Sequence, residues 1–165
     1  MAFSRPYSTH MCNHNLNEIT ENSLRFVDHR IKEFGIHLEK NLSPDLPEIY
    51  GDADNISQVI INIIVNALDS MSSGGNLTIK TGYCDFQHSS IQVVISDTGS
   101  GIPEEILNKI FNPFFTTKEM GSGLGLAISK RIIDDHNGNI IVKSRVGKGT
   151  TFYICLPVRK VTVAT

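Results

Sequence analysis

Residues 54–71 read DNISQVIINIIVNALDSM and carry the strongest periodic pattern in the chain. Their apolar residues recur at alternating gaps of three and one, which is the spacing of a helix that packs one face against a core. Two asparagines, Asn62 and Asn66, are four residues apart and therefore lie on one side of that helix. The stretch predicts a buried helix with a polar stripe along one edge.

The segments around this helix alternate between helical and extended patterns. Helices are predicted at residues 17–34, 103–110 and 124–136. Strands are predicted at residues 36–38, 77–83, 91–95, 140–144 and 150–156, the last two joined by a glycine-containing hairpin loop at 147–149. Because several strands follow one another directly, the order favours an α+β fold, a two-layer sandwich with helices on one face of a mixed sheet. A doubly wound parallel sheet would need stricter alternation.

The composition is typical of a soluble globular domain. The 165 residues are 40% hydrophobic and 19% charged, and the formal net charge of −2 gives no reason to expect nucleic acid or an acidic membrane surface as a partner. No apolar stretch is long enough to span a bilayer. Residues 1–12 lack periodicity and are expected to be a tag remnant or a disordered segment of an excised fragment. The domain is then expected at residues 13–158, followed by a tail at 159–165.

Cysteine and histidine usage indicates neither a disulfide framework nor a metal site. The three cysteines, Cys12, Cys84 and Cys155, are odd in number and far apart, which favours reduced thiols and a cytoplasmic location. The six histidines have no partners at metal-ligand spacing, so a structural zinc is not expected. His136 is interpreted as a surface or turn residue.

Asp97 ends a predicted strand and precedes two glycines, Gly99 and Gly101. An aspartate before glycine is often only a turn residue. It can also be an acceptor beside a flat ligand that the glycines allow to approach closely. A carboxylate accepts a hydrogen bond from the exocyclic amine of adenine, whereas guanine has an acceptor at that position, so Asp97 would select ATP over GTP.

A second glycine cluster, GSGLGL, lies at residues 121–126, where the predicted helix 124–136 begins. Unpaired backbone N–H groups and the helix dipole attract phosphate at such a helix start. The polar, glycine-flanked segment 116–123 fits a lid over bound phosphates. Within it, Lys118 either reaches a γ-phosphate or is an ordinary solvated lysine. Gly123 and Gly125 are expected to serve phosphate approach more than folding.

The asparagine stripe of helix 54–71 also has two interpretations. It can be a solvent-facing polar edge, since a buried asparagine without a partner costs stability. Alternatively, Asn66 offers a neutral amide oxygen to Mg²⁺, an ion that prefers oxygen ligands and keeps phosphate oxygens and waters in its shell.

Five stretches, in this order and at this spacing, resemble the motifs of one family. They are an N box at 62–67 (NIIVNA), a first glycine box at 97–101 (DTGSG), an F box at 111–115 (FNPFF), a second glycine box at 121–126 and a last one at 147–152 (GKGTTF). Over about residues 13–157 the chain resembles the ATP-binding catalytic domain of sensor histidine kinases. The same superfamily contains DNA gyrase B, the ninety-kilodalton heat-shock chaperones and MutL mismatch-repair proteins.

The resemblance implies the Bergerat fold, with about five strands covered on one face by three helices and ATP held between the N-box helix and the lid. It implies that Asp97 and Thr150 contact adenine, that Asn62 and Asn66 serve Mg²⁺ and phosphate, and that Asn66 is the metal ligand. Asn62, Asn66 and Lys118 would be the catalytic residues. The implied nucleotide-binding residues are Asn62, Asn66, Asp97, Gly99, Gly101, Ile102, Lys118, Gly121, Ser122, Gly123, Leu124, Gly125, Leu126 and Thr150. One departure is Asp69, at a position that is often basic in the family.

The family resemblance leaves kinase and hydrolase activities to be separated. Hydrolytic members have a glutamate where this chain has Asn62, and an amide cannot act as a general base. The resemblance therefore implies transfer of the γ-phosphate to a histidine on a separate dimerisation domain, with a response regulator downstream and a monomeric isolated fragment. No histidine here has the expected acid-then-proline context; His14, for example, is followed by Asn15. The alternatives are an ATP-hydrolysing switch of the gyrase or chaperone type, a serine kinase and a nucleotide-binding regulator.

Overall fold

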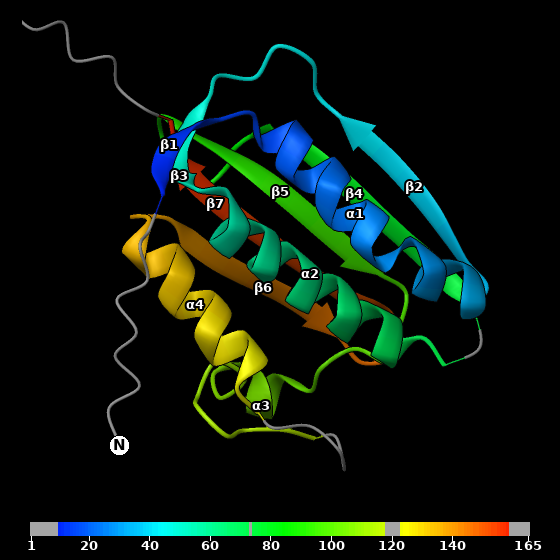
Figure 1. Cartoon of the computed structure of the whole chain (residues 1–165). Helices are drawn as coiled ribbons and strands as arrows, with labels where there is room; N and C mark the ends of the chain where they lie inside the picture. The colour runs from blue at the N-terminus through cyan, green and yellow to red at the C-terminus, as the bar shows by residue number, and fades with distance from the viewer. Residues whose placement is uncertain (1–9, 73, 118–122, 159–165) are drawn as a thin grey trace, which may run out of the picture.

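The computed structural model describes residues 10–72, 74–117 and 123–158, and its elements are shown in Figure 1. They follow one another along the chain as β1 (Met11–His14), α1 (Leu16–Glu33), β2 (Ile36–Leu42), β3 (Ile49–Asp52), α2 (Ala53–Ser70), β4 (Gly75–Tyr83), β5 (Ser90–Asp97), α3 (Glu104–Leu107), α4 (Gly125–Asp135), β6 (Asn139–Arg145) and β7 (Gly149–Pro157).

Five of these strands form one mixed sheet in the order β2-β4-β5-β7-β6. The β2–β4 pair is parallel and the other three pairs are antiparallel. Helices α1, α2 and α4 lie side by side on one face of this sheet, with α2 in the middle (Figure 1), and the short α3 contacts β6. The expected two-layer α+β sandwich is confirmed.

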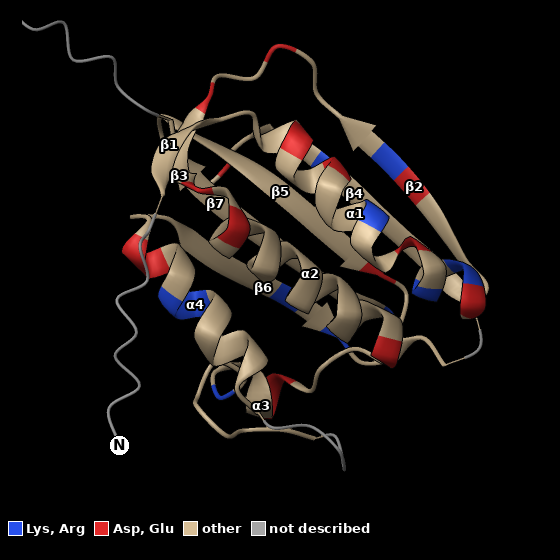
Figure 2. Ribbon diagram, in the orientation of Figure 1, with Lys and Arg blue, Asp and Glu red and all other residues tan. Residues whose placement is uncertain are grey.

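The core fills the space between α2 and the sheet. Ile60, Ile63 and Ile64 of α2 are completely buried, as are alternate residues of the central strands such as Ile91 and Val93. Between Asp54 and Asp69, close to its two ends, α2 carries no charged residue, whereas α1, β2 and α4 carry several along their length (Figure 2). The apolar periodicity of residues 54–71 thus predicted the central helix correctly.

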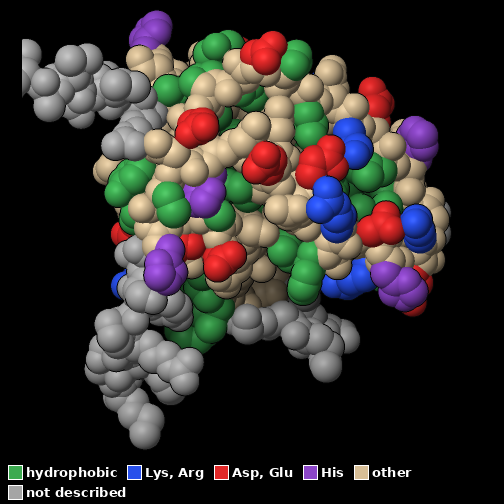
Figure 3. Space-filling model, turned by 45° about the horizontal axis from the view of Figure 1, so that its top comes forward, with side chains coloured by type: hydrophobic (Ala, Val, Ile, Leu, Met, Phe, Trp, Pro, Cys, Tyr) green, Lys and Arg blue, Asp and Glu red, His purple; other side chains and the backbone are tan. Residues whose placement is uncertain are grey.

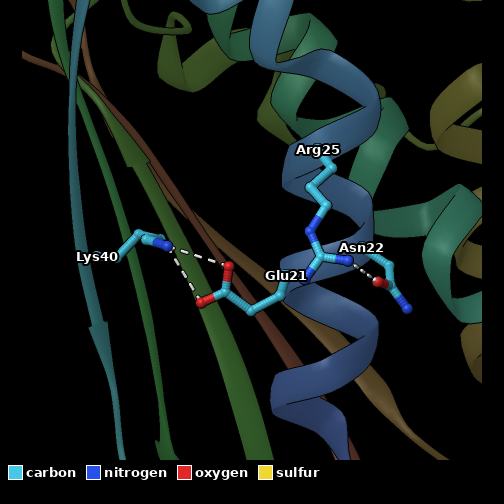
Figure 4. A network of polar contacts seen from close by, with 4 residues as sticks. All are labelled: Glu21, Asn22, Arg25 and Lys40. Atoms are coloured by element: carbon cyan, nitrogen blue, oxygen red, sulfur yellow. Dashed lines mark hydrogen bonds and ion pairs between the residues drawn. The ribbon is translucent and has the colours of Figure 1, made fainter.

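Most charged side chains instead occupy the outer surfaces, with Asp52 and Asp97 as buried exceptions. On the face seen in Figure 3, acidic side chains are spread widely, whereas most of the basic ones lie on the right-hand side beside acidic neighbours. On α1, Glu21 contacts the edge strand β2, since both of its carboxylate oxygens accept hydrogen bonds from Lys40 Nζ at 3.1 and 3.0 Å (Figure 4). Arg25 donates to Asn22 within the same helix (Figure 4). None of the described helices is both long and apolar enough to cross a bilayer.

A second, two-stranded sheet was not predicted from the sequence. β1 pairs antiparallel with β3, from Met11 opposite Asp52 to His14 opposite Ile49. The expected domain boundary at residue 13 therefore falls inside β1. Both strands have only four residues, too few for an alternating pattern to be recognised.

His136 lies in the turn after α4, as the interpretation allowed, but it is buried, so the alternative of a surface residue is wrong. Only 7% of its surface is exposed. Nε2 accepts a hydrogen bond from the backbone N–H of Asp52 at 3.0 Å, and Nδ1 lies 2.7 Å from the carbonyl oxygen of Ile132. A carbonyl can only accept, so Nδ1 donates to Ile132 while Nε2 accepts from Asp52, and the two contacts fix the orientation of the imidazole ring.

Two of the three thiols are joined, which contradicts the expectation of reduced cysteines for this pair. Cys84 and Cys155 form a disulfide, with Cα atoms 6.0 Å apart, while Cys12 is free and exposed. β5 lies between β4 and β7 in the sheet, so residues 71 positions apart in sequence become neighbours across one strand. Beside the disulfide, Phe86 of the β4–β5 loop packs edge-on against Tyr153, with ring centroids 5.1 Å apart.

Candidate nucleotide-binding site

A cavity of about 570 Å³ opens between α2, the ends of β5 and β7, and the start of α4. This volume falls within the range usual for sites that hold small ligands and cofactors. Its lining combines a few polar groups with a larger apolar wall: Asn66, Ala67, Ser70, Asp97, Ser100, Gly101, Ile102, Pro103, Ile106, Ile110, Phe115, Thr116, Thr117, Gly123, Gly125, Leu126, Thr150 and Phe152.

Asp97 lies in the wall of the cavity and is only 7% exposed. Its Oδ1 accepts hydrogen bonds from the backbone N–H groups of Gly99 at 2.8 Å and Thr150 at 3.2 Å. Burial raises the pKa of Asp97 above the ordinary 3.8, because desolvation outweighs the lowering effect of these bonds and of the Ser70 hydroxyl. The carboxyl group is therefore fixed in orientation at the point where β5 meets β7.

The loop after Asp97 is fastened to the β6–β7 hairpin. The N–H of Gly147 donates to the Ser100 carbonyl at 2.8 Å, and the N–H of Ile102 donates to Ser144 Oγ at 2.7 Å. Gly101 has φ +74°, and a Cβ there would overlap the backbone of Arg145. This close approach of two chain segments explains the glycine at position 101.

Gly99 is also required by packing, since a Cβ there would overlap the side chain of Ser70 on α2. Ser70 itself was not among the predicted site residues. It lies four residues after Asn66, hence on the same side of the helix, and this spacing would have identified it.

The two asparagines of α2 have different surroundings. Asn66 lines the cavity. Asn62 is not among the lining residues; its Nδ2 lies 3.5 Å from the Gly125 carbonyl and 3.4 Å from Ser129 Oγ, so it contacts the first turn of α4. Asp69 points away from the site toward α1, where it pairs with Arg30 at 3.6 Å. The acidic residue at this often basic position thus belongs to the contact between two helices.

Part of the second glycine box lies at the edge of the cavity. Gly123, Gly125 and Leu126 line it, while Leu124 is the N-cap residue of α4 and does not. Lys118, Gly121 and Ser122 lie outside the described residues.

The surroundings of Gly123 differ from the expectation that this glycine serves the approach of phosphate more than the folding of the chain. It has φ +72°, a Cβ there would overlap the backbone of Phe114, and its carbonyl accepts the N–H of Phe114 at 2.9 Å. Gly125 meets no such restriction, because a Cβ there has no atom within 4 Å.

Apolar residues of α3, of the segment after it and of the F box also line the cavity. They are Ile106, Ile110 and Phe115. The predicted helix 103–110 is shorter than expected, ending at Leu107 with Asn108 as its C-cap. An apolar lining together with a buried carboxylate suits a heteroaromatic ring with an amino edge.

Comparison with known proteins agrees with this geometry. Residues 51–160 match the family described as histidine kinase-, DNA gyrase B- and HSP90-like ATPases. Sporulation kinase E of Bacillus subtilis (strain 168) is 37% identical over 143 residues, which is 87% of this chain and 19% of that kinase. The chain thus spans about a fifth of the length of this relative.

Two solved structures have the same fold. The catalytic domain of histidine kinase ThkA is 32% identical, with a TM-score of 0.79 over 90% of this chain and 95% of that one. ThkA in complex with the response regulator protein TrrA is 29% identical, with a TM-score of 0.77 over 92% of this chain and 42% of the kinase. The chain therefore belongs to the histidine kinase-, DNA gyrase B- and HSP90-like ATPase family, as the ATP-binding catalytic domain of a histidine kinase.

Proposed function

We propose that this domain binds Mg-ATP and donates the γ-phosphate to a histidine on a separate dimerisation domain of its parent kinase. The observation that carries the proposal is the polarity of the cavity. Its lining brings together the buried carboxyl group of Asp97 beside Thr150, and the Asn66 amide with Gly125 at the start of α4. We assign a base with an amino group to the first pair and a chain of phosphates to the second.

At the base end, Asp97 would accept a hydrogen bond from the exocyclic amine of adenine, with Thr150 beside it. Gly99 and Gly101 would act indirectly, by letting the loop turn closely against Ser70 and Arg145. Ile102 lines the cavity with the apolar residues that face the ring.

At the phosphate end, the residues present fit a magnesium ion that arrives with the nucleotide. The described residues contain no group of three or more His, Cys, Asp or Glu side chains that could hold a metal by themselves. Asn66 would supply one amide oxygen, and phosphate oxygens and water the rest. The ion would neutralise charge on the phosphates.

The remaining phosphate contacts are assigned to the lid and the start of α4. Gly121, Ser122, Gly123, Leu124, Gly125 and Leu126 would surround the phosphates, and Lys118 would reach the γ-phosphate. Asn62 would act at this end through Gly125, whose carbonyl it already approaches.

In the transfer step, an imidazole nitrogen of the acceptor histidine attacks the γ-phosphorus. The bond from phosphorus to the β–γ bridging oxygen breaks, and ADP leaves with that oxygen. Such transfer depends mainly on alignment and on neutralisation of charge. Asn62 cannot activate water as a carboxylate would, which disfavours a hydrolytic switch of the gyrase or chaperone type.

We also propose a cytoplasmic location, a response regulator as the downstream acceptor, and a monomeric state for the isolated domain. In the cytoplasm most thiols are kept reduced. The Cys84–Cys155 disulfide would then form there only under oxidation.

The test is a transfer assay with γ-labelled ATP, this domain and the dimerisation domain of its parent. We expect label on a histidine of the added domain, none on this chain alone, and no transfer with Asn66→Ala. Lys40→Ala, which alters only the contact between β2 and α1, is the matched control. Steady phosphate release by this domain alone at about one turnover per second or faster would instead support the ATPase alternative.

A further inference from the structure

Ser144 stands behind the base end of the cavity without lining it. Its Oγ lies within hydrogen-bonding distance of three groups: the backbone N of Ile102 at 2.7 Å, the carbonyl oxygen of Gly149 at 3.1 Å and Thr150 Oγ1 at 2.8 Å. Thr150 does line the cavity and is only 6% exposed. Ser144 therefore contacts the site through Thr150.

The donors and acceptors of this cluster can be assigned. A hydroxyl group has one proton to donate and two lone pairs that accept. Ile102 N–H can only donate, so it uses one lone pair of Ser144. The Gly149 carbonyl can only accept, so it takes the Ser144 proton. The contact with Thr150 is then completed only if Thr150 donates to the second lone pair.

This arrangement determines what Thr150 presents to a ligand. With its single proton used toward Ser144, Thr150 Oγ1 has only lone pairs left for the cavity. The ionised Asp97 carboxylate beside it, joined to Thr150 through the backbone N–H at 3.2 Å, also only accepts. The base end then contains two acceptors and no side-chain donor from this pair.

We propose that Ser144 is a positioning residue that holds the Thr150 hydroxyl as an acceptor and thereby sets the choice of purine. The inference rests on the proposed function, namely binding of ATP with the base at Asp97. A 6-amino purine offers two N–H donors to two acceptors, directly or through a water. A 6-oxo purine places its oxygen against the lone pairs of Thr150, although its N1–H can still reach Asp97.

A purely structural role for Ser144 makes a different prediction. Ser144 accepts a hydrogen bond from the N–H of Ile102 and so helps to hold the loop after Asp97. Loosening that loop would weaken the binding of every purine nucleotide alike. If Ser144 orients Thr150, its removal instead changes the ratio of the affinities for 6-amino and 6-oxo purine nucleotides. Without Ser144, the Thr150 proton can rotate toward the cavity and donate to a 6-oxo group.

The experiment measures the dissociation constants of Mg-ATP and Mg-inosine triphosphate by calorimetry for wild type, Ser144→Ala and Ser144→Thr. We expect Ser144→Ala to lower the preference for ATP about five- to tenfold, as is usual for one neutral hydrogen bond, by weaker ATP binding and equal or tighter inosine triphosphate binding. Ser144→Thr retains the hydroxyl and should retain the preference. If the alanine variant does not fold, Ser144→Cys gives the same readout, because sulfur is a weak hydrogen-bonding atom of similar placement.

Thr150→Val provides the second half of the test. It should lower the preference by itself, and in that background Ser144→Ala should change the ratio no further, because the hydroxyl that it orients is gone. An equal loss for both nucleotides in Ser144→Ala, or an additional loss of preference in the double variant, would overturn the inference. Failure of the wild-type domain to bind ATP would instead contradict the proposed function itself.

Discussion

The backbone N–H of Asp52 donates to Nε2 of His136 at 3.0 Å and so joins the end of β3 to the end of α4. The same aspartate caps α2, since its Oδ1 accepts from the N–H of Asn55 at 3.1 Å. The contact therefore joins the N-cap of α2 to the C-terminal end of α4, the helix whose first turn lines the cavity.

His136→Ala should destabilise the domain by about 2–4 kcal/mol, because it leaves a buried N–H without a partner and opens a cavity. Urea denaturation of the nucleotide-free protein measures this loss. His37, exposed on β2, supplies the control, and His37→Ala should lie within about 0.5 kcal/mol of wild type. Equal stabilities for the two variants would show that the buried contact is dispensable.

The two glycines at the start of α4 should behave differently when each is replaced by alanine. Gly123→Ala should lower the thermal midpoint of the nucleotide-free domain, since its backbone is left-handed and a Cβ would overlap Phe114. Gly125→Ala has room for its Cβ and should keep the midpoint or raise it, because alanine favours the first turn of a helix. Differential scanning calorimetry without ligand makes the comparison, and a reversed order would contradict the assigned backbone conformations.

Asp97→Asn should weaken ATP binding by about 1.5–3 kcal/mol, because a charge-assisted acceptor is replaced by an amide that also carries a donor. The amide oxygen can still accept from Gly99 and Thr150, so the fold should survive. Calorimetric titration gives the affinity, and Asp69→Asn, on the α1 side of the same region, is the matched loss of one carboxylate. ATP affinities that fall equally in both variants would point to net charge and away from a contact with the base.

The free energy of unfolding should depend on pH through Asp97. Burial raises the pKa of Asp97 in the folded protein above its ordinary 3.8, so the folded state binds this proton more tightly than the unfolded chain. The contribution of Asp97 is therefore fully present below pH 3.8 and is lost as the pH rises through the raised value. In urea titrations without nucleotide, the free energy of unfolding of Asp97→Asn should rise relative to that of wild type as the pH increases from 3.8 through the raised pKa. A difference that does not change with pH would remove this explanation.

The disulfide should stabilise the oxidised protein. The disulfide closes a loop of 71 residues. It lowers the conformational entropy of the unfolded chain and so raises the free energy of unfolding by about 4 kcal/mol. Dithiothreitol should therefore lower the thermal midpoint of wild type and leave Cys84→Ser unchanged, while Cys12→Ser responds as wild type does. Three titratable thiols in denatured, unreduced protein would exclude the bond.

The periodic sequence patterns predicted the helices and strands whose apolar residues recur at regular spacing. The stripe from Ile56 to Leu68 gave α2, and the alternation around Ile91 and Val93 gave the central strand. The two-stranded sheet was missed because its pairing joins Met11 to Asp52 through short segments. Distant pairs of this kind leave no periodic signal in either partner.

The site residues that belong to a recognisable motif were predicted from the sequence. Those that belong to no motif were not. Asp97, Asn66 and Thr150 were identified from motifs and line the cavity. Ser144 belongs to no pattern, and only the pairing of β6 with β7 places it beside Thr150. Asn62 was expected at the phosphates, but its side chain contacts α4 because that helix packs along the same edge of α2.

The strand order β2-β4-β5-β7-β6 has a consequence for biosynthesis. Of the five strands of this sheet, β7 leaves the ribosome after the other four, yet it fills the place between β5 and β6, which are made earlier. Until it is inserted, β5 exposes an unpaired edge, β6 has no neighbour in the sheet, and Asp97 lacks the backbone of Thr150. A nascent chain can therefore shape its helices early, but it becomes able to hold a nucleotide only in one late step of sheet closure, and until then its open strand edges are exposed to aggregation.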